Sequence, residues 1–314
     1  MGRTALKLKS ERPLKRSIVK LAATVFLGKG WAHAQNWLPG LELRIPAKPQ
    51  GEGAIVFRGE RVAALHHADL LRKTAHETIH IVGSGPSIAG VDFSRVAPGE
   101  AILLNGAINL VGTRIGSPLA VAIEDERFVW RHFPLMREKI GPGTICLLSV
   151  GVIRAICEKD RAWLADKRVV LIDDVRKPYR VRRRSDEDLR HLDFAVLADD
   201  GAGFSRDPSR GVFQGGSVAV SALQFAAFCR PATIGLFGID ISNAGEPRFY
   251  EKAGDTAGSG IAGAAGRIVA HFALARRVCA EENIEILNFS PVSALVGAGF
   301  PYDPRFAAAK AATA

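Results

Sequence analysis

The chain has 314 residues, of which 47% are hydrophobic and 24% are charged, so it can bury a large core, and its composition excludes a disordered chain. The formal net charge of +10 favours an anionic partner such as a nucleotide, a nucleic acid, an anionic lipid or an anionic glycan. The four cysteines lie far apart without a CxxC pair, which argues against a zinc site or a disulfide framework and indicates the cytoplasm.

Residues 1–75 are predicted to form a basic, helical N-terminal extension, interrupted by Pro46 and Pro49. Near its start, one helical face is apolar and carries Ile18, Leu21, Ala22, Val25 and Phe26. No stretch is long enough to span a membrane. Two interpretations of this basic amphipathic segment stay open, namely peripheral contact with an anionic membrane surface or packing against the enzyme's own core.

From Glu77 onward, short apolar runs alternate with helical patterns, which predicts an α/β domain over residues 76–306 and a frayed tail over 307–314. Few of the predicted strands alternate apolar with polar residues, so we expect a Rossmann-like, mostly parallel sheet with helices on both faces. Strands are predicted at 78–82, 101–104, 119–123, 144–149, 169–172, 232–237 and 284–287, and helices at 217–228 and 264–282. The glycine-rich segment 242–266 is predicted to be a flexible lid.

A glycine-rich turn, residues 83–87 (GSGPS), follows the first strand of this domain and precedes a helical pattern. Gly83, Ser84, Gly85 and Ser87 are therefore predicted to bind a phosphate at a helix N-terminus. A dinucleotide site is not indicated, because Ile88 stands where the third glycine of that motif belongs. A Walker motif is absent as well.

Further polar residues follow the ends of other predicted strands or open a predicted helix. In a parallel sheet these positions gather at one edge, so we expect them to line a nucleotide site together with the glycine turn. The residues are Asn105, Glu124, Asp125, Ser217, Gly238 and Asp240. For each residue alone, a helix-cap or turn role remains an equal alternative.

The basic run 176–184 (RKPYRVRRR) has two open interpretations. Arg180, Arg182 and Arg183 could bind an anionic acceptor such as a lipopolysaccharide core or a lipid-linked glycan, or they could belong to a solvated charged loop. Nucleic acid is disfavoured, because the run has one aromatic residue and no nucleic-acid motif accompanies it.

Three segments together, IHIVGSGPSI, GGSVAVSALQFAAFCRPATIGLFGID and NFSPVSAL, resemble the superfamily of the bacterial CMP-sialic-acid sialyltransferases. The motility-accessory flagellin glycosyltransferases and the hydroxymethylpterin pyrophosphokinase-like proteins share this layout. The resemblance covers roughly residues 79–295 and implies a single-domain Rossmann-like glycosyltransferase with a lid. It implies nucleotide contacts at the glycine turn, Asn105, Ser217, Gly238 and Asp240, and Tyr250 is the one lid tyrosine available for the phosphate.

Some features depart from that superfamily. Ser84 replaces an asparagine inside the turn, no histidine lies between Asp240 and Ala270, and acidic residues follow the third strand, where the superfamily has asparagine. The candidates for the general base are therefore His271, Glu251 and Asp255, of which only histidine has an unperturbed pKa near neutrality.

The leading hypothesis is a glycosyltransferase that moves a sialic or other ulosonic acid from a CMP-activated donor to a cell-surface glycan or lipopolysaccharide. Hydrogen-bond donors can stabilise the departing CMP without a metal, so no cofactor is expected. One alternative is a pyrophosphotransferase that holds Mg²⁺ through Glu124, Asp125 and Asp240. The other is a non-catalytic nucleotide-binding protein.

Overall fold

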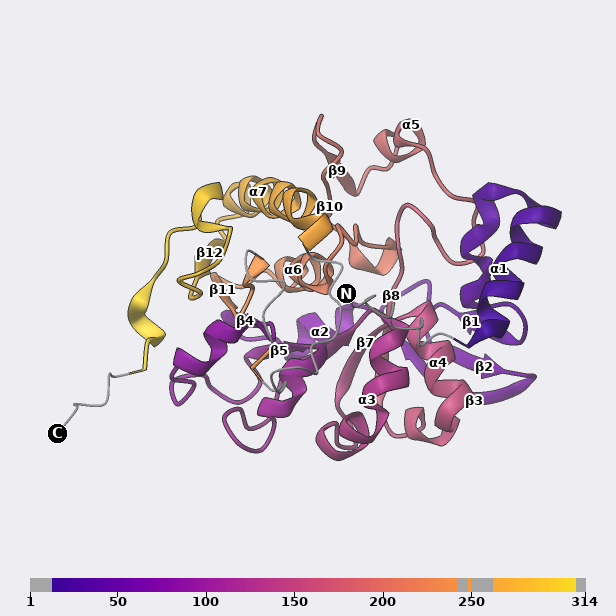
Figure 1. Cartoon of the computed structure of the whole chain (residues 1–314), viewed down its shortest axis with the longest axis horizontal. Helices are drawn as coiled ribbons and strands as arrows, with labels where there is room; N and C mark the ends of the chain where they lie inside the picture. Colours follow the sequence, from indigo (N-terminus) through magenta and orange to yellow (C-terminus); the bar gives the residue numbers. More distant parts are fainter. Residues whose placement is uncertain (1–12, 242–247, 250–261, 309–314) are drawn as a thin grey trace, which may run out of the picture.

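A ten-stranded sheet organises the chain in the computed structural model, which describes residues 13–241, 248–249 and 262–308 (Figure 1). The strands lie in the order β1-β2-β3-β8-β7-β6-β5-β4-β11-β12. Their bounds are β1 Leu41–Arg44, β2 Gly53–Phe57, β3 Glu60–His66, β4 Thr78–Val82, β5 Ala101–Leu104, β6 Ala120–Ile123, β7 Ile145–Ser149, β8 Arg168–Ile172, β11 Thr233–Phe237 and β12 Glu285–Asn288.

Every neighbouring pair from β3 through β8 to β12 is parallel, and only β2 runs antiparallel to its two neighbours. The central strands β5, β6 and β7 are buried at every residue. Such continuous apolar strands require cover on both faces. The predicted mostly parallel α/β sheet is therefore confirmed.

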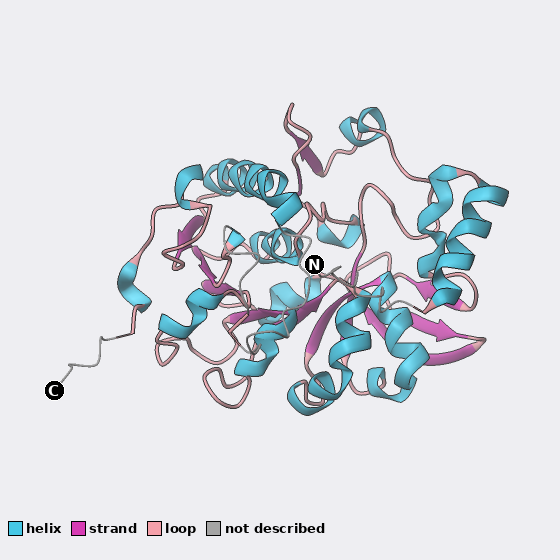
Figure 2. Ribbon diagram, in the orientation of Figure 1, coloured by secondary structure: helices cyan, strands magenta, loops and turns pink. Residues whose placement is uncertain are grey.

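Helices cover the two faces of the sheet, as Figure 2 shows. One apolar core contains side chains of α2 (Asp69–Thr74), α6 (Val218–Phe228) and α7 (Ala265–Glu281). The other contains side chains of α3 (Glu126–Lys139) and α4 (Val150–Asp160). Further elements include α1 (Leu14–Leu27), α5 (Asp186–Arg190), the 3-10 helix η1 (Lys29–Asn36) and a two-stranded sheet of β9 (Ala195–Leu197) and β10 (Gly203–Ser205). Within the described residues, no helix is both long and apolar enough to cross a membrane.

The stretch before residue 76 corrects the predicted extension. Strands β1, β2 and β3 belong to the main sheet, because β3 pairs in parallel with β8 through Leu65 and His66. Strand β1 alternates buried and exposed residues, with Glu42 and Arg44 turned toward solvent or the edge of the core. These charges and the nearby prolines hid the strand pattern from the sequence analysis. Of the described residues before 76, residues 13–40 precede the sheet and α2 follows β3.

Two further predictions fail at the level of elements. The turn after β4 leads into the 3-10 helix η2 (Pro86–Gly90) and not into an α-helix. The predicted frayed tail begins too early, since Ala307 forms a bridge with Val91 and the Ala308 amide donates to the Gly90 carbonyl. Most of the predicted lid, residues 242–266, lies outside the described residues.

The chain order places a topological switch point between β4 and β11. From β4 the chain moves strand by strand through β5, β6 and β7 to β8, and it then crosses to the other side of β4 to form β11 and β12. In open parallel sheets, ligands bind beyond the carboxyl ends of the strands at such a point.

Candidate active site

A cavity of about 1220 Å³ opens at the carboxyl ends of the parallel strands. Residues that follow β4, β5, β6, β8 and β11 line it, together with the N-terminal end of α6 and two side chains of α7. This strand-end cavity brings together most of the predicted nucleotide residues: Gly83, Ser84, Gly85, Asn105, Glu124, Asp125, Ser217, Gly238 and Asp240. Ser87 does not line the cavity.

The two glycines of the turn have a packing role that the sequence analysis did not predict. A Cβ on Gly83 would lie 2.4 Å from the Gly238 carbonyl oxygen, and a Cβ on Gly85 would lie 2.4 Å from Oδ2 of Asp240. The Gly83 amide donates to the Phe237 carbonyl at 2.7 Å, and the Gly85 amide donates to the Gly238 carbonyl at 3.0 Å. The glycines are therefore required because the ends of β4 and β11 touch.

Asp240 stabilises this junction. It accepts hydrogen bonds from the Ser87 amide on Oδ2 and from the Ser87 hydroxyl on Oδ1, both at 2.7 Å, and the residue is 8% exposed. Both carboxylate oxygens are thus used inside the protein. Gly83, Ser84, Gly85 and Pro86 of the turn line the cavity, and all of them except Gly83 are half-buried.

Asn105 lies where β5 ends and has two unusual features. Its backbone is left-handed, with φ of 44°, and its buried Oδ1 has no hydrogen-bond partner among the described residues. A buried polar atom without a partner costs roughly 1–3 kcal/mol, and backbone strain of this kind concentrates at functional sites. Asn105 also lines the cavity.

The helix N-terminus that faces the cavity is that of α6. Gly215 and Gly216 have φ of 57° and 99°, and Ser217 caps the helix by accepting from the Ala219 amide. Arg267 of α7 crosses this turn, donating through Nε to the Gly215 carbonyl at 3.1 Å. The amides of Ser217, Ala219 and Val220 donate within this turn, so the groups it presents to an anion are the positive end of the helix dipole and the Arg267 guanidinium. Arg267 was missed by the sequence analysis, because a polar residue on a helix carries no positional signal.

His271 lies one turn further along α7 and also lines the cavity. It is 4% exposed, and its Nδ1 lies 2.8 Å from the Arg267 carbonyl oxygen. Because a carbonyl only accepts, Nδ1 carries the proton and Nε2 carries the lone pair. Burial lowers the His271 pKa, which favours the neutral ring at neutral pH. This state is the one that a general base requires.

Five carboxylates line the cavity beyond β6 and β8, namely Glu124, Asp125, Glu126, Asp173 and Asp174. Burial raises the pKa of Glu124 to about 8 despite a 2.9 Å hydrogen bond from the Ser221 hydroxyl. Asp125 caps α3 through the Arg127 amide. Burial also raises the pKa of Asp173 to about 7, and Asp173 accepts from the Tyr179 amide. Asp173 and Asp174 were missed, although they follow the predicted strand 169–172 and carry the same strand-end signal as Glu124.

The residues proposed for Mg²⁺ do not fit a metal site. Asp240 is held by Ser87, and Asp125 is held by the start of α3 and by the Arg127 guanidinium. In the part of the chain that the structure describes, no three histidine, cysteine or acidic side chains converge on one point. The geometry therefore gives the pyrophosphotransferase alternative no support from Glu124, Asp125 and Asp240.

Only one of the three arginines predicted to bind the acceptor reaches the cavity. Arg183 lines it, beside Arg176 and Lys177, whereas Arg180 and Arg182 are exposed outside it. Arg182 packs against Gly30 instead. Tyr250, Glu251 and Asp255 lie outside the described residues.

Comparison with known proteins identifies the family. The model of the family described as 3-deoxy-D-manno-octulosonic acid transferase WaaZ matches residues 62–302. The chain belongs to this family. It is therefore a glycosyltransferase. The match begins inside β3, which agrees with the finding that this strand is part of the main sheet.

Other comparisons add less. No curated protein sequence matches the chain. Among solved structures, the chain is similar to the sialyltransferase CstII from Campylobacter jejuni in complex with a substrate analogue, cytidine-5'-monophosphate. The identity is 14%, the alignment covers 75% of this chain and 89% of that one, and the TM-score is 0.35. The predicted glycosyltransferase class is thus confirmed through the family, and sialyltransferase activity stays a prediction.

Proposed function

We propose that this protein transfers 3-deoxy-D-manno-octulosonic acid, an ulosonic acid, from a CMP-activated donor to a lipopolysaccharide acceptor. The observation that carries this proposal is the anion site at the start of α6, with His271 directly beside it. A Cβ on Gly216 would lie 2.8 Å from Nη2 of Arg267, and a Cβ on Gly215 would lie 3.0 Å from Cγ of His271. A leaving phosphate and a general base can therefore occupy the same corner of the cavity.

The chemistry follows from that arrangement. An acceptor hydroxyl attacks the anomeric carbon of the donor sugar, the bond from that carbon to the phosphate oxygen breaks, and CMP leaves as a phosphate monoester. The positive end of the α6 dipole, the Ser217 hydroxyl and Arg267 stabilise the charge that develops on the phosphate. Nε2 of His271 takes the proton from the acceptor hydroxyl. Hydrogen-bond donors and Arg267 supply this stabilisation without requiring a metal.

The nucleoside would extend from the phosphate toward the ends of β4 and β5. There Asn105 offers its unpartnered Oδ1 to a ribose hydroxyl or to the cytosine amino group, and Ser84 adds a hydroxyl. The acceptor would approach from the side of Arg176, Lys177 and Arg183, whose charges suit the phosphates of lipopolysaccharide. We place the enzyme on the cytoplasmic side of the inner membrane, where such an acceptor is anchored.

Nucleotide calorimetry tests the donor. We expect CMP to bind more tightly than AMP, GMP or UMP by about tenfold or more, and EDTA to leave its affinity unchanged. Tight binding of ATP that requires Mg²⁺ would favour the pyrophosphotransferase alternative. If none of these nucleotides binds, the proposal is contradicted.

Rate measurements test the base. We expect His271→Ala to lower turnover by at least about a hundredfold with little change in donor KM, since a general base typically contributes a factor of 10² to 10⁴. Glu251→Gln and Asp255→Asn serve as the comparison. If His271→Ala stays active while one of these two loses turnover, the base is a carboxylate of the predicted lid.

A further inference from the structure

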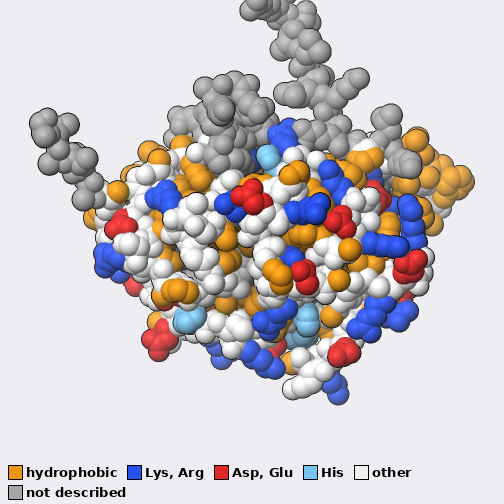
Figure 3. All heavy atoms as spheres, turned by 90° about the horizontal axis from the view of Figure 1, so that it is seen from below, with side chains coloured by type: hydrophobic (Ala, Val, Ile, Leu, Met, Phe, Trp, Pro, Cys, Tyr) orange, Lys and Arg blue, Asp and Glu red, His pale blue; other side chains and the backbone are white. Residues whose placement is uncertain are grey.

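The first helix packs with its apolar stripe turned away from the protein. The α1 apolar stripe consists of Ile18, Leu21, Val25 and Phe26, which are 66%, 66%, 68% and 83% exposed. The opposite side of α1 holds Arg16, 2% exposed, and Ala23, 5% exposed. Hydrophobic side chains gather at the right-hand edge of Figure 3, the side on which α1 lies in Figure 1. Packing of this stripe on the enzyme's own core is therefore ruled out.

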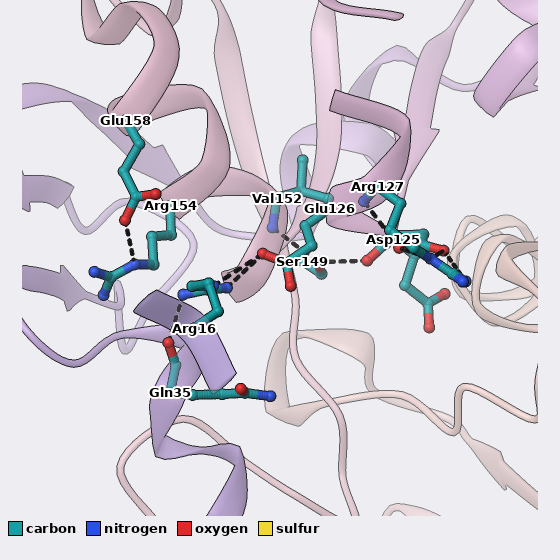
Figure 4. A network of polar contacts seen from close by, with 10 residues as sticks. Arg16, Gln35, Asp125, Glu126, Arg127, Ser149, Val152, Arg154 and Glu158 are labelled. Atoms are coloured by element: carbon teal, nitrogen blue, oxygen red, sulfur yellow. Dashed lines mark hydrogen bonds and ion pairs between the residues drawn. The ribbon is translucent and has the colours of Figure 1, made fainter. Parts of the chain in front are cut away.

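Buried polar contacts fix this orientation. Nη2 and Nε of Arg16 donate to Oε2 of Glu126 at 2.6 and 3.1 Å, and Nη1 donates to the Gln35 carbonyl (Figure 4). Both side chains of the ion pair are 3% exposed. Because a buried charge must keep its partner, α1 cannot rotate its stripe inward without breaking this pair. The exposed stripe is thus a consequence of the packing and not of a loosely attached helix.

Positive charge surrounds the stripe. Lys20 on α1 and Lys29 at the start of η1 are exposed. The basic loop that includes Arg180, Arg182 and Arg183 is joined to η1, because the Arg183 amide donates to the Gly30 carbonyl at 2.9 Å and Nε2 of His33 lies 3.0 Å from the Val181 carbonyl. The arginines of this loop and the adjacent Val181 are exposed. The surface therefore combines apolar side chains with an excess of cations.

We propose that the α1 apolar stripe docks onto an anionic lipid bilayer. A helix with an apolar stripe and a cationic surround lies in the bilayer interface, with the apolar side chains at the boundary of the acyl chains and the cations among the headgroups. The same surface on a second copy would bring like charges together, so charge complementarity favours lipid over self-association. The docked form of the enzyme holds α1 parallel to the membrane plane.

Docking would also orient the strand-end cavity. Lys20 of α1 and the η1 residues His33, Gln35 and Asn36 line that cavity, so its rim adjoins the membrane-facing helix. If the proposed function holds, a lipid-anchored acceptor is presented to the cavity directly from the headgroup layer. Docking of α1 on a bilayer does not require the transfer reaction, so either proposal can be refuted without refuting the other.

Vesicle cosedimentation tests the docking. Wild type and Leu21→Ser/Val25→Ser are compared on vesicles of phosphatidylglycerol and phosphatidylethanolamine, and on vesicles of phosphatidylcholine alone. The matched control is Ile45→Ser/Val296→Ser, which removes two apolar side chains that are 42% and 43% exposed elsewhere. We expect the α1 variant to lose at least about tenfold in partitioning to anionic vesicles, and the control to match wild type. Phosphatidylcholine should retain all three proteins weakly.

A second measurement covers the case in which the serine variant loses its helix. In Phe26→Trp, we expect the added emission to shift to shorter wavelength on anionic vesicles. Equal partitioning of wild type and the α1 variant, or an unshifted emission, would overturn the proposal. A lipid-free dimer that dissociates in Leu21→Ser/Val25→Ser would also overturn it, because a second copy would then cover the stripe.

Discussion

At the scale of single residues, a bound ligand would explain two features of Asn105. These are its left-handed backbone and its buried Oδ1, which has no hydrogen-bond partner among the described residues. We expect Asn105→Gly to weaken CMP binding about three- to tenfold, because one hydrogen bond contributes about 0.5–1.5 kcal/mol. Stability should not fall, since glycine adopts φ of 44° without strain. Calorimetry checks the affinity and thermal unfolding checks the stability.

Asn283 supplies the control for that substitution. It has φ of 59° and lies outside the strand-end cavity, so Asn283→Gly makes the same backbone change without touching the ligand. CMP affinity should match that of wild type. If both variants bind CMP as wild type does, Asn105 is not a nucleotide contact.

Because the pKa of Glu124 is raised, we expect the free energy of unfolding to depend on pH. Its folded pKa of about 8 lies above its ordinary value of 4.5, so the folded state holds a proton that the unfolded state releases. The resulting stabilisation is present below pH 4.5 and is lost as pH rises through 8. We expect wild type to lose on the order of 1–3 kcal/mol more than Glu124→Gln between pH 5 and 8. Denaturant unfolding at several pH values measures the free energy of unfolding, and Glu187→Gln serves as an exposed control. If this free energy changes with pH in the same way for all three proteins, the expectation for Glu124 is contradicted.

At the scale of elements, the Arg16–Glu126 pair determines how α1 is held. Removing one partner of a buried pair typically costs about 3–5 kcal/mol, whereas replacing both by apolar residues is often neutral. We therefore expect Glu126→Gln to increase proteolysis within residues 13–36 and to lower stability, and Arg16→Met/Glu126→Leu to recover most of the loss.

The exposed pair Arg305–Asp303 gives the comparison for this cycle. Asp303→Asn should change the free energy of unfolding by less than about 1 kcal/mol, because exposed ion pairs contribute little. If Glu126→Gln behaves like Asp303→Asn, the orientation of α1 does not depend on the buried pair.

The elements that could be predicted from the sequence are those with a clear apolar pattern over neighbouring residues. Continuous apolar runs gave strands β4 and β5 with their observed bounds, and a long periodic segment gave α7 within one residue at each end. Strands β1 and β3 escaped because their charged residues interrupt the apolar pattern. The missing helix after β4 has another cause, since the end of β11 occupies the space beside that turn. A contact between residues so distant in the chain leaves no local pattern.

In the candidate site as well, local patterns could be predicted from the sequence, whereas contacts between distant residues could not. Polar residues at strand ends identified Asn105 and Glu124, because parallel strands bring their carboxyl ends together regardless of detail. The two bonds from Ser87 to Asp240 could not be predicted from the sequence, since they depend on the contact between β4 and β11. Arg267 became visible only once α7 was packed across the start of α6.

At the scale of the whole molecule, the fold places the start of α6 with Arg267, the buried His271 and the exposed amphipathic helix α1 around one cavity. The first two serve the proposed transfer, and the third would hold the enzyme at the surface where its acceptor is anchored. The central claim is the transfer itself.

Mass spectrometry of the acceptor tests that claim most directly. Purified wild-type protein is incubated with CMP-activated 3-deoxy-D-manno-octulosonic acid and a lipopolysaccharide inner-core acceptor, with His271→Ala in parallel. We expect one residue of the ulosonic acid to be added to the acceptor for each CMP released, and the variant to add less by at least about a hundredfold. An unmodified acceptor in the presence of this donor, together with transfer from a different nucleotide sugar, would contradict it.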